Sequence, residues 1–106
     1  MNSQQQDNEQ NIRPDQVEMT LNEHPEIKEV SVISVDHNAA DRKLRAIVVR
    51  MPESTLTEEQ VLDWCREKLG EAACPQSVIF VQALPRNRVG KLSMRDIKSK
   101  WGNPFG

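Results

Sequence analysis

The sequence predicts an α+β domain in which a small three-stranded sheet is flanked by helices, in the order αββαβα. Three features predict this fold: runs of β-branched residues, capping residues before segments with helical spacing, and proline or glycine at the ends of several elements. The length of 106 residues is enough for one hydrophobic core and too short for a second domain beside it. We therefore expect a single compact unit.

The first predicted element is a helix that begins at Pro14. Proline suits the first helical position, and Asp15 places an acid at the positive end of the helix dipole. We expect Pro25 to end this helix, because proline lacks a backbone donor and disfavours the helical conformation of the residue before it. The residues expected on one face of the helix are Val17, Leu21 and His24.

Two strands are predicted next. Residues 27–35 are rich in β-branched types, and their apolar side chains occur at both odd and even positions, which indicates a strand covered on both faces. The residues that alternate between those faces are Val30 and Val32 against Ile33 and Val35. Residues 36–42 are polar and predict a loop, and residues 44–51 predict a second strand, which Pro52 ends.

A second helix and a third strand complete the predicted sheet. Thr57 and Gln60 form a capping-box pattern, and Gly70 is a suitable residue to end the helix that follows it. The residues expected on one face of this helix are Leu62, Cys65 and Leu69. The short apolar run at residues 78–81 predicts the third strand.

The last predicted helix runs from Ser93 to Trp101. Ser93 with Asp96 three residues later is a typical capping pattern at a helix N-terminus. Helical spacing then places Met94, Ile97 and Trp101 on a single stripe. We therefore expect Met94 and Trp101 to lie in the core.

Composition limits the remaining possibilities. Residues 1–11 contain no apolar residue after Met1, which predicts a flexible polar tail, and residues 102–106 are expected to form a C-terminal tail. We recognise neither a secretion signal nor a stretch long enough to span a bilayer, so we expect a cytoplasmic protein without a membrane partner. Cys65 and Cys74 lack the spacing of a metal or redox motif, so we expect reduced thiols and no metal site.

The segment between the third strand and the last helix, residues 84–92, contains a Gly90-Lys91 pair that invites comparison with a phosphate-binding P-loop. A P-loop needs GxxxxGK followed by Ser or Thr, so that glycines let backbone amides surround a phosphate. Here Pro85 stands at the first glycine position and Leu92 follows the lysine. We therefore expect no P-loop.

The same segment resembles the LPRxxxGK signature near the C-terminus of acyl-CoA synthetases and related adenylate-forming enzymes. Four further segments resemble parts of that family in order and spacing, and they are residues 12–18, 24–36, 46–49 and 75–81. The likeness extends over about residues 11–101 and places the domain at residues 12–101. The resemblance implies the small, mobile C-terminal lid domain of these ligases.

The resemblance also implies a mechanism. Family members join a carboxylate to ATP, release pyrophosphate, and usually pass the acyl group to coenzyme A or to a carrier pantetheine. Lys91 matches the signature lysine and is the expected catalytic residue, while Pro85, Arg86 and Gly90 are expected to support its loop. ATP with Mg²⁺ and the thiol would be held by a larger N-terminal adenylation domain or subunit, with none of them bound tightly by this chain alone. An acyl carrier protein is a further candidate partner.

One part of the family pattern is not recognisable. Counting back from Ile12, Glu9 occupies the position of a glycine in the loop that lines the pantetheine tunnel, which places thioester formation in question. We expect a stand-alone or excised domain of an ATP-dependent acid–thiol ligase, inactive alone. The alternative is a non-catalytic interaction or regulatory module that docks on a synthetase or carrier protein. The acyl substrate depends on a pocket in the larger domain.

Positive charge gathers toward the end of the chain even though the net charge is −2. The basic residues between positions 86 and 100 are Arg86, Arg88, Lys91, Arg95, Lys98 and Lys100. Charge alone does not distinguish nucleic acid from an anionic small molecule or an acidic protein. We do not expect nucleic-acid binding, because the interleaved stacking aromatics of single-strand binders are missing and Trp101 is explained by the core.

Overall fold

A computed structural model of the chain describes residues 13–35 and 43–103. Its elements are α2 (Pro14–Asn22), β1 (Ile27–Ser34), β2 (Leu44–Arg50), α3 (Glu58–Leu69), the 3₁₀ turn η1 (Glu71–Ala73), β3 (Ser77–Phe80) and α4 (Met94–Trp101). The predicted order is confirmed, with η1 as an addition. The predicted tail at 1–11, the predicted loop at 36–42 and the end of the C-terminal tail at 104–106 lie outside the described residues.

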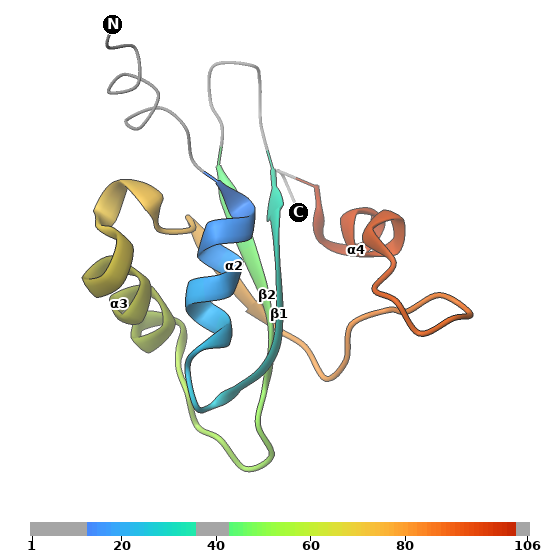
Figure 1. The fold of residues 1–106 in the computed structure, drawn as a ribbon, viewed down its shortest axis with the longest axis horizontal. Helices are drawn as coiled ribbons and strands as arrows, with labels where there is room; N and C mark the ends of the chain where they lie inside the picture. The colour runs from blue at the N-terminus through green and yellow to red at the C-terminus, as the bar shows by residue number, and fades with distance from the viewer. Residues whose placement is uncertain (1–12, 36–42, 104–106) are drawn as a thin grey trace, which may run out of the picture.

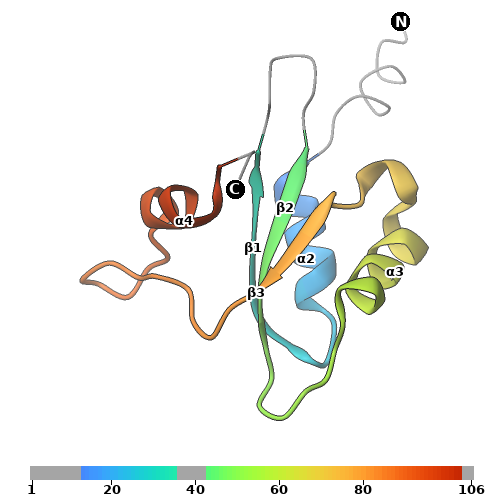
Figure 2. The ribbon, with the colours of Figure 1, turned by 180° about the vertical axis from the view of Figure 1, so that it is seen from behind.

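The three strands form one mixed sheet in the order β1-β2-β3. β1 and β2 are antiparallel, whereas β2 and β3 are parallel and are joined through α3 and η1. Helices α2 and α3 cover one face of the sheet, and α4 lies on the other side, as Figure 1 and the reverse view in Figure 2 show. The small sheet flanked by helices is therefore as the sequence predicts.

Each face of the sheet has its own hydrophobic core. The first core lies under α2 and α3, and its buried members are Val17, Leu21, Ile27, Val30, Val32, Leu44, Ala46, Val48, Leu56, Val61, Cys65 and Val78. The second core lies on the α4 side, and its buried members are Ile33, Val35, Ile47, Val49, Leu84 and Ile97. The strands supply side chains to both cores, so the predicted alternation along β1 is confirmed.

Both ends of α3 follow from local chemistry, whereas the end of α2 does not. At α3, the Thr57 hydroxyl accepts a hydrogen bond from the backbone N–H of Gln60 at 3.2 Å, and the Gln60 side chain accepts one from the N–H of Thr57 at 3.0 Å. The predicted capping box is thus confirmed, and Gly70 ends the helix with a φ of 89°. Helix α2 ends at Asn22, earlier than the expected stop at Pro25.

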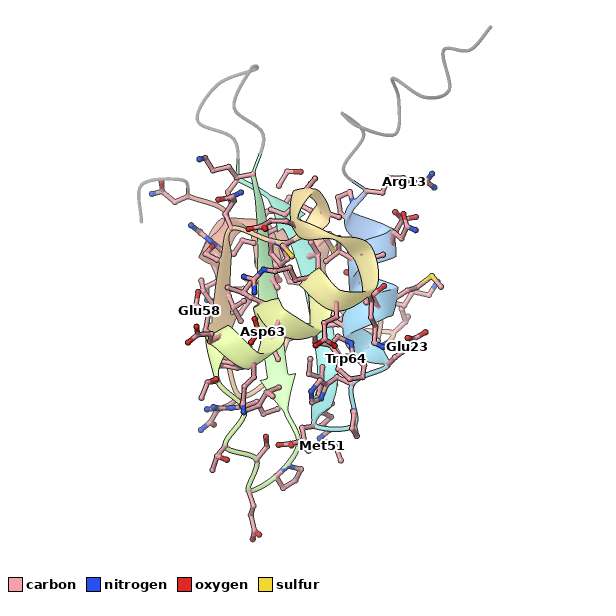
Figure 3. All side chains as sticks on the ribbon, turned by 90° about the vertical axis from the view of Figure 1, so that its left-hand side faces the viewer. Arg13, Glu23, Met51, Glu58, Asp63 and Trp64 are labelled. Atoms are coloured by element: carbon pink, nitrogen blue, oxygen red, sulfur yellow. The ribbon has the colours of Figure 1, made fainter. Side chains whose placement is uncertain are left out.

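His24 therefore lies outside α2, contrary to the expectation that it shares the helical face. Its backbone N–H donates to the carbonyl of Leu21 at 3.0 Å, and its ring meets the Trp64 ring edge-on with centroids 4.5 Å apart. The Trp64 indole N–H also donates to the Thr20 carbonyl at 2.8 Å. Trp64, labelled in Figure 3, thus joins α3 to the end of α2.

Helix α4 confirms one expectation and corrects another. The Ser93 hydroxyl accepts a hydrogen bond from the N–H of Asp96, Ile97 is fully buried, and Trp101 packs half-buried against the second core. Met94 is 42% exposed, so its expected place in the core is wrong. It lies at the first turn of α4, where its sulfur accepts only a long contact from the Ser31 hydroxyl at 3.8 Å. Helical spacing predicts which side chains share one face of a helix. It does not predict how much of that face the rest of the core covers.

Glutamates from the two covering helices bind the outer strands of the sheet. Glu18 of α2 accepts a hydrogen bond from the backbone N–H of Val32 in β1 at 2.9 Å. Glu58 at the start of α3 accepts one from the N–H of Val78 in β3 at 3.3 Å. Each outer strand therefore has a carboxylate bonded to its main chain.

Both cysteines are free thiols, as expected. Cys65 is fully buried in the first core, whereas Cys74 is half-buried. Burial, and secondarily the neighbouring Cys74, raises the pKa of Cys65 to about 12. Cys65 is therefore a neutral packing residue at physiological pH. Within the described ranges, no helix is both long and apolar enough to cross a membrane.

Candidate functional site

The segment between β3 and α4 extends away from the sheet on the same side as α4, and both ribbon views show it in orange (Figures 1 and 2). Its two ends are fixed by apolar packing in the second core. Leu84 is buried there, and Leu92 is half-buried against the same group. We call residues 84–92 the lysine loop. The loop thus projects from a fixed base.

Backbone hydrogen bonds close the lysine loop into a narrow hairpin. Arg86 and Leu92 form an isolated antiparallel bridge, and the N–H of Ser93 donates to the carbonyl of Pro85 at 2.9 Å. At the tip, Gly90 donates to the carbonyl of Asn87 at 3.1 Å and has a φ of 87°, a left-handed conformation that favours glycine. The structure therefore gives Gly90 a conformational role at the turn.

Asn87 orders the tip of the loop and is not among the site residues predicted from the sequence. Its side-chain oxygen accepts hydrogen bonds from the backbone N–H groups of Val89 and Lys91, each at 3.0 Å. Its own N–H donates to the Lys91 carbonyl at 2.8 Å. Asparagine at the start of a turn that ends in glycine is a known turn signal, so Asn-x-x-Gly could have identified this residue.

Arg86 connects the loop to the sheet. One guanidinium nitrogen, Nη1, donates to the carbonyl of Gly90 at 2.9 Å. The other, Nη2, pairs with Oε1 of Glu29 in β1 at 2.9 Å. The expectation that Arg86 supports the loop thus has a structural counterpart. Glu29, which lies 57 positions earlier in the sequence, was not foreseen.

Lys91 combines a fixed main chain with an exposed side chain. The Gly90 carbonyl, the Lys91 N–H and the Lys91 carbonyl all have hydrogen-bond partners inside the loop. Within the part of the chain that the structure describes, the Lys91 ammonium has neither a hydrogen-bond partner nor an ion-pair partner. The arrangement therefore presents a cation to whatever approaches the tip of the loop.

The surroundings of Lys91 are positive and partly apolar. Arg88 and Arg95 are exposed, and neither has an ion-pair partner among the described residues. Val89 at the turn is 77% exposed, and Met94 at the start of α4 is also exposed. Such a surface can attract an anion electrostatically and can contact an apolar protein surface.

The described residues also form a hollow, which lies apart from Lys91. A hollow of about 370 Å³ is lined by the β2–α3 turn together with Lys28, Val81 and Gln82, and Lys91 is not among its lining residues. In the described ranges, no three His, Cys, Asp or Glu side chains gather closely enough to hold a metal ion.

Residues 16–91 match the family model described as AMP-binding enzyme C-terminal domain, and the match ends at Lys91. The chain is 35% identical over 89 residues to 2-succinylbenzoate–CoA ligase of Bacillus cereus strain Q1, which covers 84% of this chain and 18% of that protein. It is 34% identical over 80 residues to medium-chain-fatty-acid–CoA ligase of Ectopseudomonas oleovorans, covering 76% of this chain and 15% of that protein.

Solved structures agree with these relatives. ATP-bound MatB from Rhodopseudomonas palustris superimposes with a TM-score of 0.80 at 30% identity, covering 90% of this chain and 19% of that one. A Mycobacterium tuberculosis fatty acyl CoA synthetase gives a TM-score of 0.75 at 28% identity, covering 84% and 18% of the respective chains. The chain thus spans less than a fifth of the length of these proteins. It belongs to the family of C-terminal domains of AMP-binding, adenylate-forming ligases.

Proposed function

We propose that this domain supplies Lys91 to an active site whose remaining parts lie in a larger ATP-binding domain, where a carboxylate is converted to an acyl-adenylate. The observation that carries the proposal is an exposed ammonium without a partner among the described residues, on a main chain fixed by hydrogen bonds. Its position at the end of the family match supports the same role.

The chemistry suits a lysine. When a carboxylate attacks the α-phosphate of ATP, negative charge grows on the phosphate oxygens and pyrophosphate leaves. A lysine ammonium is a compact positive charge on a flexible stem, so it can reach across an interface to those oxygens. Stabilisation of developing charge is strongest in a site that excludes water. The larger domain would provide that enclosure together with ATP, Mg²⁺ and the acyl substrate.

Transfer of the acyl group to a thiol is the second proposed step. Relatives of this chain include proteins named as CoA ligases, which supports coenzyme A as acceptor, with a carrier pantetheine as the alternative. The partner in either case is the large adenylation domain or subunit, and an acyl carrier protein joins it where the acceptor is a pantetheine. Free thiols at Cys65 and Cys74 are consistent with a reducing, cytoplasmic setting.

The test is ATP–pyrophosphate exchange by the chain combined with its large domain. We expect Lys91→Ala to lower the exchange rate by about a hundredfold or more, the usual scale for loss of one group that stabilises developing charge. Lys68→Ala is the matched control, because Lys68 lies on α3, over the Trp64 ring and on the opposite side of the sheet. Exchange that is unchanged by Lys91→Ala would overturn the catalytic proposal.

A second candidate function is a non-catalytic module that docks on a synthetase or carrier protein. The exposed apolar side chains of Val89 and Met94 favour it, because they offer contact area independent of the Lys91 charge. In that case Val89→Ser would weaken co-purification with the large domain, whereas Lys91→Ala would alter neither co-purification nor the partner's activity. The two candidates therefore make opposite predictions for Lys91→Ala.

A further inference from the structure

We infer that Glu29 is a positioning residue for Lys91. It lies on β1, outside the lysine loop, and touches neither the loop tip nor the ammonium. It acts through Arg86, whose guanidinium holds the peptide unit that precedes the Lys91 side chain. The inference rests on the proposed function only for its catalytic consequence, since the ordering of the loop can be measured separately.

The peptide between Gly90 and Lys91 is held at both polar ends. Its carbonyl accepts from Nη1 of Arg86 at 2.9 Å, and its N–H donates to the side-chain oxygen of Asn87 at 3.0 Å. A peptide unit is planar, so fixing both ends fixes the direction in which the next Cα carries its side chain. Glu29 fixes the guanidinium in turn through Nη2, at 2.9 Å. The contact with Glu29 is charge-assisted, which makes it stronger than a hydrogen bond between neutral groups.

An irregularity in β1 directs Glu29 toward the loop. Ile27 pairs with Arg50 and Glu29 pairs with Val49, so two steps along β1 correspond to one step along β2. Lys28 is therefore the extra residue of a β-bulge, a feature that changes the face to which the following side chains point. Ile27 consequently joins the first core, while Glu29 meets Arg86 on the α4 side.

The exposure of the pair favours a positioning role over a stabilising one. The side chain of Arg86 is 44% exposed and that of Glu29 is 30% exposed. Ion pairs with this much contact with water contribute little to the free energy of folding. Loss of Glu29 should therefore leave the fold intact and act on the order of the loop, as expected of a residue that fixes geometry.

The first experiment measures ¹⁵N relaxation of the amides at positions 88–91 in the whole chain. We expect order parameters near about 0.85 in the native protein and below about 0.6 in Glu29→Ala. Glu29→Gln keeps an acceptor for Nη2 of Arg86 and should stay close to native. Asp63→Ala is the matched control, because it removes another exposed ion pair, to Arg66 on α3, and should leave the loop unchanged.

A native-like order parameter in folded Glu29→Ala would overturn the inference. If Glu29→Ala does not fold, Arg86→Lys serves as the second variant, because a lysine cannot reach Glu29 and the Gly90 carbonyl with separate nitrogens of a rigid fork. It should loosen the loop in a folded protein. Loss of the fold in both variants would also overturn the inference, since the pair would then be structural.

The second experiment measures adenylation kinetics with the large domain present. We expect Glu29→Ala to lower kcat about five- to tenfold with KM for ATP unchanged, because a misplaced catalytic group slows the chemical step more than it weakens binding. Glu29→Gln should recover most of the rate. If Lys91→Ala has no effect on kcat, the proposed function fails. If Lys91→Ala is inactive but Glu29→Ala retains native kcat and loop order, only the positioning role fails.

Discussion

The face of the sheet under α2 and α3 buries twelve apolar side chains among the described residues, whereas the face under α4 buries six. The first face has two helices joined to each other through Trp64 and one helix fixed by a capping box. The second has one helix of eight residues and the hairpin that presents Lys91. The large core thus lies opposite the candidate site, which occupies the thinner side of the domain.

This difference separates the roles of the two faces. Regions with fewer buried apolar contacts open locally at lower cost than the main core, and sites that must adapt to a partner are commonly found there. The first face is expected to hold the sheet as a rigid support. The second is expected to let α4 open locally while the sheet stays folded.

The largest expected effects come from emptying each core in turn. Leu21→Ala in the first core and Ile97→Ala in the second should each cost about 3 kcal/mol, because both side chains are fully buried. Leu21→Ala should lower protection from hydrogen exchange throughout the sheet. Ile97→Ala should remove protection mainly from α4. Uniform loss of protection in both variants would show that the two faces unfold as one unit.

A pH titration tests the first face alone. The folded protein raises the pKa of Cys65 from 9.0 to about 12, so the thiol is neutral in both states below pH 9 and its stabilising contribution is then fully present. Above pH 9 the unfolded thiol ionises while the folded one does not, and this contribution is lost as pH rises toward 12. Between these two pKa values, ionisation of Cys65 should raise the unfolding constant of the native protein by about tenfold per pH unit. Cys65→Ala should lack this contribution.

Urea unfolding from pH 8 to pH 11 would measure that slope. The chain contains no tyrosine, so the other titrating groups at these pH values are mainly lysines and the Cys74 thiol, which both proteins share. Cys74→Ala is the matched control and should keep most of the dependence, because Cys74 is less buried than Cys65. Equal slopes in the native protein and Cys65→Ala would contradict the assignment.

The smallest expected effects come from two turns that each contain a left-handed residue. Glu53 follows Pro52 in the turn that leads to α3 and has a φ of 67°, whereas the left-handed position of the lysine loop is occupied by Gly90. Glu53→Gly should raise the free energy of unfolding by about 0.5–1 kcal/mol, because it relieves left-handed strain at some cost in chain entropy. Gly90→Ala should lower it by about 1 kcal/mol. Thermal unfolding of the two variants measures both, and a stability loss in Glu53→Gly would show that the turn is not strained.

Local signals predicted most of the elements. The capping box at Thr57, the glycine after α3 and the β-branched runs all act within a few residues, so their consequences follow from sequence alone. The parallel pairing of β2 with β3 was not specified in advance, because strands that pair across a helix leave no local mark of their direction. The end of α2 was misplaced for a related reason, since His24 is held outside the helix by packing against the distant Trp64.

The candidate site was predictable in part. Family resemblance predicts a role for Lys91 and the loop residues Pro85, Arg86 and Gly90, and the structure places all four in one hairpin. Glu29 could not be found in this way, because its partner lies 57 positions away and its direction depends on a bulge. Met94 was misjudged because periodicity ignores where the covering surface ends.

The carboxylates of Glu18 and Glu58 affect how readily another chain can add to the edges of the sheet. An open strand edge is a template onto which another chain can add, and a three-stranded sheet has two such edges. Charged acceptors bonded to Val32 and Val78 occupy backbone donors that an added strand would need. Each outer strand therefore offers one fewer free N–H group to a strand of another chain that would add to the sheet.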